Sequence, residues 1–261
     1  MKRLGLLAHP TRAEAHRVAE VLTKLAEARG LEVVDASAEG PFEVVLGVGG
    51  DGTILRAAEV AAKERVPLLG VKVGRLGFLT AVHEDGLGAA LEALSTGTYE
   101  IETRMMLEAL ASGAESGVSA LNEIVVEKAS PARVIDLRVE VGEEEVATYT
   151  ADGFIVSTPT GSTAYSLSAG GPLVEPRLRA MVLTPVSAHY PVWRPIVIGP
   201  DRPVVLALLK GSAALVADGR TIGSLAPGAV VTVRPRREDL QVVRLRGPKF
   251  FERLKSRFHL E

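Results

Sequence analysis

The sequence contains no cysteine, so disulfide bonds, thiolate metal sites and cysteine nucleophiles are all excluded. It also lacks an excess of either charge, since 30 Lys and Arg residues stand against 32 Asp and Glu residues. No bulk positive field therefore attracts nucleic acid or anionic lipid, and we expect neither nucleic acid nor a membrane as a partner. No apolar run approaches the ~20 residues of a membrane span. The apolar segment Leu4–Ala8 is too short for a signal peptide, so we expect a cytoplasmic protein.

The 261 residues are 47% apolar and 24% charged, a balance typical of a soluble globular protein with one large or two small domains. The first hundred residues alternate between short, continuous apolar runs and apolar residues at helical spacing. This alternation predicts an α/β domain in which helices cover both faces of a parallel, Rossmann-like sheet. We expect strands at 4–7, 31–34, 42–46 and 68–73, and helices at 11–29, 54–65 and 87–94.

The pattern changes after about residue 100. Apolar and polar residues alternate through 134–141, which is the period of a half-exposed strand, and Gly and Pro punctuate similar runs. We therefore expect an all-β second domain over residues 101–235. Apolar residues return to helical spacing between Phe250 and Phe258, and we expect the tail 236–261 to pack back on the first domain. The arginine-rich stretch from Arg234 to Arg246 is interpreted as a solvated strand edge.

A glycine-rich loop, Gly47-Val48-Gly49-Gly50-Asp51-Gly52-Thr53, separates an expected strand from an expected helix. Glycines let the backbone approach a phosphate, and the free N–H groups of a helix start point at it. Three of the glycines match the dinucleotide pattern G-x-G-x-x-G, but Lys72 occupies the neighbourhood where that fold needs an acid. No Gly-Lys-Ser/Thr follows, so the loop is not a P-loop either.

Asp51 is the unusual member of this loop. Taken alone, it would be the N-cap of the following helix. At about 4 Å from a phosphate, electrostatic repulsion would destabilise the carboxylate by up to about 4 kcal/mol. The helix dipole would offset only ~0.3–1 kcal/mol of this repulsion. A bridging divalent cation, or transfer of a proton to Asp51 from an attacking hydroxyl, would resolve this conflict, and both are roles in phosphoryl transfer. Arg56, one turn later, either adds a fixed positive charge or lies on a solvated helix face.

A second polar segment runs from Asp152 to Pro172. Seven Ser or Thr residues fall between 157 and 168, with no charged residue and one aromatic, Tyr165. Dense small hydrogen-bonding groups beside an aromatic ring suit a sugar or a base, and a tight structural loop is the alternative. The adjacent pair Asn122-Glu123 starts an apolar strand and would, taken alone, be a turn. No G-x-S-x-G motif is present, and the five histidines have no metal-ligand spacing.

Together these segments resemble the ATP-dependent NAD kinases over roughly residues 44–220. Gly49–Thr53 is similar to the family's phosphate-donor loop, and Gly74–Leu79 to its next loop. Asn122-Glu123 matches its Asn-Glu pair, and 152–172 is similar, nearly residue for residue, to its NAD-binding segment. The phosphate-donor loop alone is shared with lipid kinases, whereas the hydroxyl-rich segment is specific to NAD kinases.

The resemblance implies an active site between a phosphate-donor domain, 1–100, and an NAD-binding domain, 101–235. The implied reaction transfers the γ-phosphoryl group of ATP, or of another donor such as polyphosphate, to the 2′-hydroxyl of the adenosine ribose of NAD, giving NADP. Asp51 would activate that hydroxyl or help to hold a divalent cation, Mg²⁺. The resemblance implies donor-phosphate binding by Gly49, Gly50, Asp51, Gly52 and Thr53. It implies NAD binding by Asp51, Gly52, Arg56, Asn122, Glu123, Arg133, Asp152, Thr163, Ala164, Tyr165, Ser166, Leu167 and Ser168.

The family also forms homodimers or homotetramers, so we expect self-association. The sequence departs from the family at two places: Arg220 follows Asp218-Gly219 where a neutral amide is usual, and 189–195 lacks the usual Leu-Ser. Two other functions remain open. A lipid kinase would need an apolar acyl cavity, and a non-catalytic NAD(P)-binding sensor would bind NAD without turnover.

Overall fold

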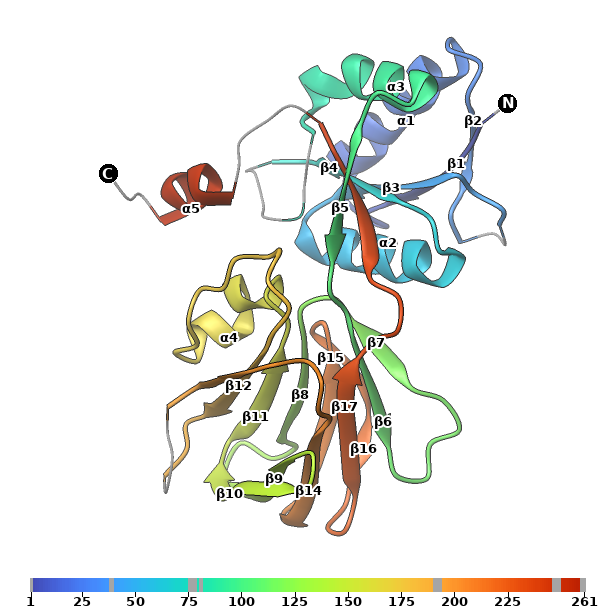
Figure 1. Ribbon diagram of the computed structural model, residues 1–261. Helices are drawn as coiled ribbons and strands as arrows, with labels where there is room; N and C mark the ends of the chain where they lie inside the picture. The colour runs from blue at the N-terminus through green and yellow to red at the C-terminus, as the bar shows by residue number, and fades with distance from the viewer. Residues whose placement is uncertain are drawn as a thin grey trace. The chain divides into compact units, whose positions relative to one another are not determined.

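The computed structural model describes residues 2–37, 40–74, 79, 82–189, 194–245 and 250–258. The chain forms two compact units (Figure 1). Unit 1 comprises Met1–Arg104 and Glu238–Glu261, and unit 2 comprises Met105–Arg237. Unit 1 holds helices and a largely parallel sheet, and unit 2 is built almost wholly from antiparallel strands. The α/β and all-β classes expected from the sequence are therefore confirmed.

The sheet of unit 1 has six strands in the order β2-β1-β3-β4-β18-β5. All neighbours are parallel except β5, which is antiparallel to β18. Its strands are β1 (Arg3–Ala8), β2 (Glu32–Asp35), β3 (Val44–Gly49), β4 (Leu68–Lys72), β5 (Glu100–Arg104) and β18 (Leu240–Arg244). Every residue of β3 is buried, which explains why this central strand is a continuous apolar run.

Helices cover both faces of this sheet (Figure 1). Leu22 and Leu91, from two helices on one face, share a hydrophobic core with Leu46. The opposite face packs against a third helix so closely that a Cβ on Gly47 would lie 2.9 Å from the Cβ of Ala57. Glycine is therefore required in the middle of β3. The helices of unit 1 are α1 (Ala13–Glu27), α2 (Asp51–Glu64), η1 (Glu84–Gly86), α3 (Leu87–Thr96) and α5 (Phe250–Phe258).

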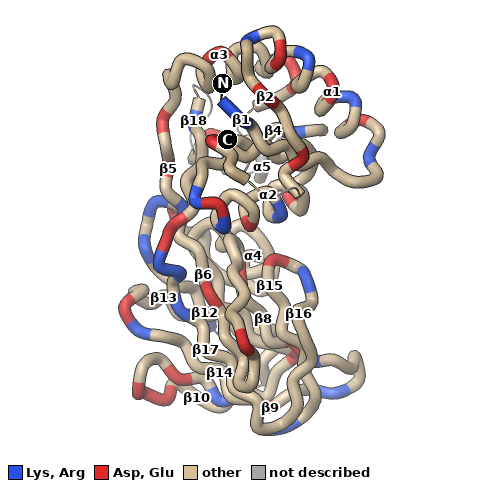
Figure 2. The backbone as a smooth tube through the Cα atoms, turned by 90° about the vertical axis from the view of Figure 1, so that its right-hand side faces the viewer, with Lys and Arg blue, Asp and Glu red and all other residues tan. Residues whose placement is uncertain are grey.

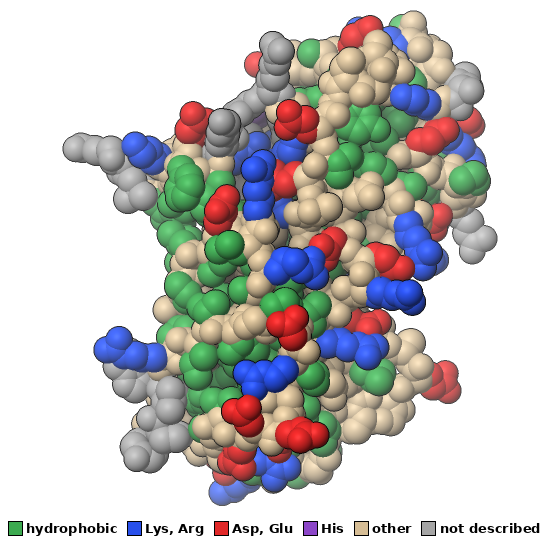
Figure 3. Space-filling view, viewed as in Figure 1, with side chains coloured by type: hydrophobic (Ala, Val, Ile, Leu, Met, Phe, Trp, Pro, Cys, Tyr) green, Lys and Arg blue, Asp and Glu red, His purple; other side chains and the backbone are tan. Residues whose placement is uncertain are grey.

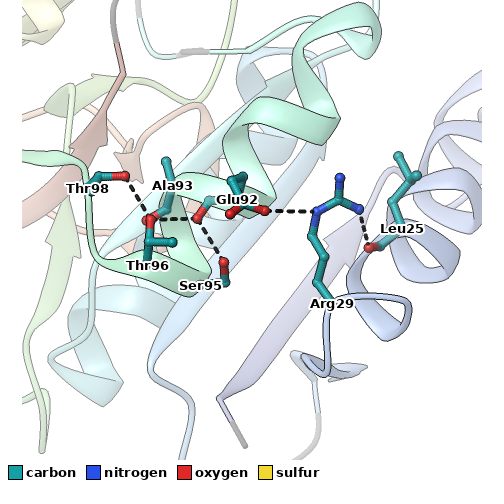
Figure 4. Close-up of polar contacts among 7 residues, drawn as sticks. All are labelled: Leu25, Arg29, Glu92, Ala93, Ser95, Thr96 and Thr98. Carbon is teal, nitrogen blue, oxygen red and sulfur yellow. Dashed lines mark hydrogen bonds and ion pairs between the residues drawn. The ribbon is translucent and has the colours of Figure 1, made fainter.

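Polar contacts tie the C-terminal end of α1 to α3 (Figure 4). Arg29 Nη1 donates to the Leu25 carbonyl at 2.8 Å, and its Nε lies 3.6 Å from Glu92 Oε2. The Ser95 and Thr96 hydroxyls both donate to the Glu92 carbonyl, each at 2.8 Å. Hydroxyl groups thus add hydrogen bonds to a carbonyl near the C-terminal end of α3.

A buried ion cluster joins β5 to β18. Both carboxylate oxygens of Glu102 accept hydrogen bonds, one from Arg104 at 2.6 Å and one from Arg244 at 2.8 Å. Burial lowers the pKa of Arg104 to about 10. The interpretation of 234–246 as a solvated edge is therefore wrong for Arg244, whose side chain is 15% exposed, although Arg234 is exposed. Arg246 lies outside the described residues.

Unit 2 consists of two six-stranded antiparallel sheets, β10-β9-β14-β17-β6-β7 and β13-β12-β11-β8-β15-β16. Side chains from both sheets form one hydrophobic core, in which Tyr149 and Phe154 are the largest fully buried residues. The expected alternating strand is β9, with Ile135, Leu137, Val139 and Val141 buried. The strands are β6 (Leu107–Ala111), β7 (Val118–Ala120), β8 (Glu123–Lys128), β9 (Ile135–Val141), β10 (Glu144–Ala151), β11 (Gly153–Ser157), β12 (Met181–Val186), β13 (Ile196–Ile198), β14 (Val204–Lys210), β15 (Ala213–Ala217), β16 (Arg220–Leu225) and β17 (Val230–Pro235).

Acidic and basic residues are interspersed along both units (Figure 2). Within the described ranges, no helix is long and apolar enough to cross a membrane.

Candidate functional site

The glycine loop of unit 1 lies where β3 ends and α2 begins. Gly49 has a φ of +155°, and a Cβ there would lie 2.6 Å from Thr53 Oγ1, so the loop requires glycine at this position. At Gly50 and Gly52, by contrast, an added Cβ would meet nothing within 4 Å. The first N–H groups of a helix have no intrahelical acceptor. The backbone at the start of α2 is therefore accessible to an anion.

Asp51 is the first residue of α2 rather than its N-cap. Gly50 occupies the N-cap position, and no side chain caps the helix there, so the N-cap interpretation of Asp51 is wrong. The carboxylate instead accepts a hydrogen bond from Lys72 Nζ, with 3.1 Å between Nζ and Asp51 Oδ1. Lys72 is the last residue of β4 and pairs with Gly49 in the sheet. The parallel register therefore places a lysine beside the aspartate of the loop.

The two arginines expected to bind NAD are both exposed. Arg56 lies on α2, and Arg133 lies in the loop between β8 and β9. Neither forms an ion pair with another residue in the described part of the chain.

In unit 2, the Asn122-Glu123 turn is held by a residue that the sequence analysis did not single out as a site residue. The Asp218 carboxylate accepts hydrogen bonds from the backbone N–H groups of Leu121 at 2.8 Å, Asn122 at 2.7 Å and Glu123 at 3.2 Å. Asp218 has a φ of 48°, and the adjacent Gly219 is also left-handed. An Asp-Gly pair is a turn signal in a sequence, but it does not reveal which amides the aspartate will bind.

Glu123 is 5% exposed, and its Oε2 has no hydrogen-bond partner. Burial and the nearby Asp218 raise the pKa of Glu123 to about 8, opposed by the backbone N–H of Tyr165. Burial also raises the pKa of Asp218, but three backbone amides and the charge of Arg220 oppose that rise. We therefore assign the proton to Glu123 at neutral pH and the negative charge to Asp218.

Most of the hydroxyl-rich segment is structural. Thr158 Oγ1 donates to the Leu121 carbonyl at 2.6 Å and accepts from the Gly161 N–H at 3.0 Å. Ser162 Oγ donates to the Pro159 carbonyl at 2.7 Å and accepts from the Val174 N–H at 3.0 Å. Five of the seven hydroxyl residues are buried: Ser157, Thr158, Thr160, Ser162 and Ser166. These hydroxyl groups form hydrogen bonds within the loop that contains η2 (Gly161–Thr163) and α4 (Tyr165–Ser168).

The predicted NAD-binding residues of this loop differ in exposure. Tyr165 is 40% exposed and Ser168 is also exposed, whereas Thr163, Ala164 and Leu167 are half-buried. The Ser166 hydroxyl is fully buried and lies 3.0 Å from Thr184 Oγ1, so it faces the protein interior. Figure 3 shows hydrophobic side chains gathered on the face of unit 2 that carries α4 and β12.

The remaining acidic residue of the predicted site, Asp152, directly follows β10 and forms an ion pair with Lys128 at 2.6 Å. Burial raises the pKa of Tyr165, and the negative charges of Glu127, Asp152 and Glu123 add to the rise. Asp152, Glu123 and Tyr165 therefore belong to one region of unit 2. Gly161 joins this region to the Asn122 turn, because a Cβ on Gly161 would lie 2.1 Å from the Asn122 carbonyl oxygen.

Two parts of the sequence resemblance cannot be placed. Residues 75–78 of the loop Gly74–Leu79, and 190–193 of the divergent segment 189–195, lie outside the described residues. Within the described ranges, no three His, Asp or Glu side chains are grouped so that they could hold a metal ion.

Comparison with known proteins identifies the family. Residues 7–99 match the model of the ATP-NAD kinase N-terminal domain, and residues 121–245 match that of the C-terminal domain. The NAD kinase of Heliobacterium modesticaldum is 44% identical over 83% of this chain and 78% of its own length. The NAD kinase of Symbiobacterium thermophilum is 42% identical over 94% of this chain and 90% of its own length.

Solved structures agree with this assignment. An NAD kinase from Archaeoglobus fulgidus in complex with ATP is 29% identical, with a TM-score of 0.78 over 99% of each chain. A yeast NADH kinase complexed with NADH is 20% identical, with a TM-score of 0.87 over 100% of this chain and 88% of its own, and shows the same fold. With family matches in both units and relatives above 40% identity, the chain belongs to the ATP-NAD kinase family.

Proposed function

We propose that the protein transfers the γ-phosphoryl group of ATP to the 2′-hydroxyl of the adenosine ribose of NAD, giving NADP. The observation that carries this proposal is the glycine turn between β3 and α2. Its helix start is accessible to a phosphate, and its carboxylate is held beside that position by Lys72. Relatives that are NAD kinases by name, and a related NAD kinase that binds ATP, support the substrates.

We assign donor binding to the backbone of residues 49–53 and activation of the ribose hydroxyl to Asp51. NAD would bind on unit 2 at Asn122, Glu123, Asp152 and the exposed part of 163–168, where polar groups and Tyr165 lie together. These assignments follow the resemblance and are supported by the local geometry of each unit.

The same geometry fits a divalent cation that is bound mainly through the donor. Asp51 is the one carboxylate of the loop, and Mg²⁺ commonly binds through one or two carboxylates together with substrate phosphates. When bound, the cation would neutralise charge on the phosphates during transfer. On the protein side, Asp51 would be the residue that holds it.

A turnover assay tests the proposal. Purified protein is incubated with NAD, Mg²⁺ and either ATP or polyphosphate, and NADP is measured with an NADP-specific dehydrogenase. We expect NADP with ATP, and the polyphosphate arm determines the donor range. Asp51→Asn should lower turnover by about 100-fold or more, with NAD affinity near that of the wild type. Glu59→Gln, which removes an exposed carboxylate from the same helix, is the matched control.

The outcomes separate the alternatives. Asp51→Asn protein that keeps most of its rate would overturn the role of Asp51. Wild-type protein that binds NAD in calorimetry but forms no NADP from either donor would be a sensor, and absence of NAD binding would favour a lipid kinase. The homodimer or homotetramer and the cytoplasmic location stay predictions, which light scattering and cell fractionation would test.

A further inference from the structure

Lys72 has a contact that the general pattern of a phosphate-binding glycine loop does not require. Its ammonium group lies 3.1 Å from Asp51 Oδ1, and its side chain is only 10% exposed, whereas that of Asp51 is 51% exposed. The strand register explains the contact, because Lys72 at the end of β4 pairs with Gly49 at the end of β3. The lysine thus approaches the loop from the neighbouring strand and from the less exposed side.

The position of this pair is where a ligand is expected in such a sheet. Ligands of open parallel sheets bind outside the carboxyl ends of the strands, and both Gly49 and Lys72 are carboxyl-terminal residues. An ammonium group has three N–H donors, and among the described residues Asp51 is the one side chain to which Lys72 donates. Lys72 can therefore hold the carboxylate and still donate to a second anion.

The charges around the cavity that Lys72 lines are unfavourable for an anion. Lys72 also lines a cavity of about 560 Å³, whose walls carry the carboxylates of Glu14, Glu84 and Asp85. A phosphate in that cavity would meet three carboxylates, of which Glu84 forms an ion pair with Arg17. The start of α2, with accessible backbone at Gly50 and Gly52, offers N–H donors instead.

We propose that Lys72 is a phosphate-binding residue of the donor site, which neutralises Asp51 in the free protein and donates to the donor phosphates when they bind. The positive charge of Lys72 allows the Asp51 carboxylate and a phosphate chain to lie at the same loop before any divalent cation binds. The inference rests on the proposed function only in identifying the phosphate chain as that of ATP. Phosphate binding by Lys72 can be tested without any turnover.

The primary experiment measures the binding of tripolyphosphate by calorimetry in EDTA, so that no divalent cation takes part. Lys72→Met should bind tripolyphosphate about tenfold more weakly than the wild type, and Lys72→Arg should recover most of the affinity. Asp51→Asn should bind it more tightly, because the competing carboxylate is removed while Lys72 stays. Lys63→Met, which removes an exposed lysine from the last turn of α2, should bind like the wild type.

Steady-state kinetics provide the second measurement. Lys72→Met should raise KM for ATP about tenfold and leave KM for NAD within about twofold, because of the two substrates the lysine would contact only the phosphate donor. If the role of Lys72 were purely structural, Lys72→Met would raise both KM values together, and Lys72→Arg would not restore them. Equal tripolyphosphate affinity in Lys72→Met and Lys63→Met, or weaker binding by Asp51→Asn in EDTA, would overturn the inference.

The experiments distinguish a failure of the Lys72 inference from a failure of the proposed kinase function. If wild-type protein makes no NADP but Lys72→Met still loses tripolyphosphate affinity, the phosphate-binding role stands and the kinase assignment fails. If Lys72→Met does not fold, Asp51→Asn and Lys72→Arg still decide the question, since both keep a cation beside the loop.

Discussion

The buried carboxyl of Glu123 predicts how the stability of the protein depends on pH. Glu123→Gln replaces the carboxyl group with an amide of similar shape that also donates a hydrogen bond but does not titrate. The pKa of Glu123 is about 8 in the folded protein, raised from its ordinary 4.5 by burial and by Asp218. The folded protein therefore holds a proton that the unfolded chain releases between these two values.

The sign and size of the effect follow from this difference in proton binding. Because the folded state binds more protons than the unfolded state, the free energy of unfolding falls as pH rises from about 4.5 to 8. Each pH unit in that window costs about 1.4 kcal/mol, which gives a total of about 5 kcal/mol as an upper value. Glu123→Gln should lose this dependence and be the more stable protein at pH 8.

Urea denaturation followed by circular dichroism at pH 5, 6.5 and 8, in buffer without NAD, provides the measurement. The difference between Glu123→Gln and wild-type protein should grow with pH and be smallest at pH 5. Glu143→Gln removes an exposed carboxyl in the turn between β9 and β10 and should follow the wild type at every pH. A constant difference between Glu123→Gln and wild type across this range would refute the assignment of the proton to Glu123.

Two further substitutions test the packing described above. Gly161→Ala should cost about 1–3 kcal/mol in urea denaturation and weaken NAD binding, because the new Cβ would lie 2.1 Å from the Asn122 carbonyl oxygen. Gly223→Ala, with nothing within 4 Å of its Cβ, should change stability by less than about 0.5 kcal/mol, and equal costs would contradict the steric argument. Glu102→Gln should cost about 3–5 kcal/mol, because it removes the negative charge that two largely buried arginines share. Glu108→Gln, at a more exposed ion pair, should cost less than about 1 kcal/mol, so a similar loss in both variants would argue against a special role of burial.

The parallel sheet could be predicted because the burial of a strand determines which residue types it contains. All residues of β3 are buried, and a strand buried on both faces must be apolar throughout. β18 has no such continuous apolar run, since it lies near the end of the sheet and ends in an arginine. Its ion pair with Glu102 joins residues 142 positions apart, and no local pattern identifies such a partner. The sequence alone therefore predicts a solvated edge for the basic stretch.

In the candidate site, too, local sequence patterns predict local backbone properties but do not identify contacts between distant residues. The spacing of Gly49 and Gly52 predicts an accessible helix start, because that property depends on the local backbone. The partner of Asp51 depends on which strand lies beside β3, and the sequence alone does not identify Lys72 as that partner. Likewise, the hydroxyl groups between 157 and 168 suggested a ligand surface, whereas most of them satisfy backbone groups within the loop.

The place of β18 between β4 and β5 has a consequence for synthesis of the chain on the ribosome. β4 and β5 both emerge before any of unit 2, but neither pairs with the other, because the strand that separates them is among the last to be made. The nascent chain must therefore keep an open sheet edge at β4 while the whole of unit 2 is translated, and such edges favour pairing with other chains. Truncation before Leu240 would accordingly remove an interior strand of unit 1 rather than a dispensable tail.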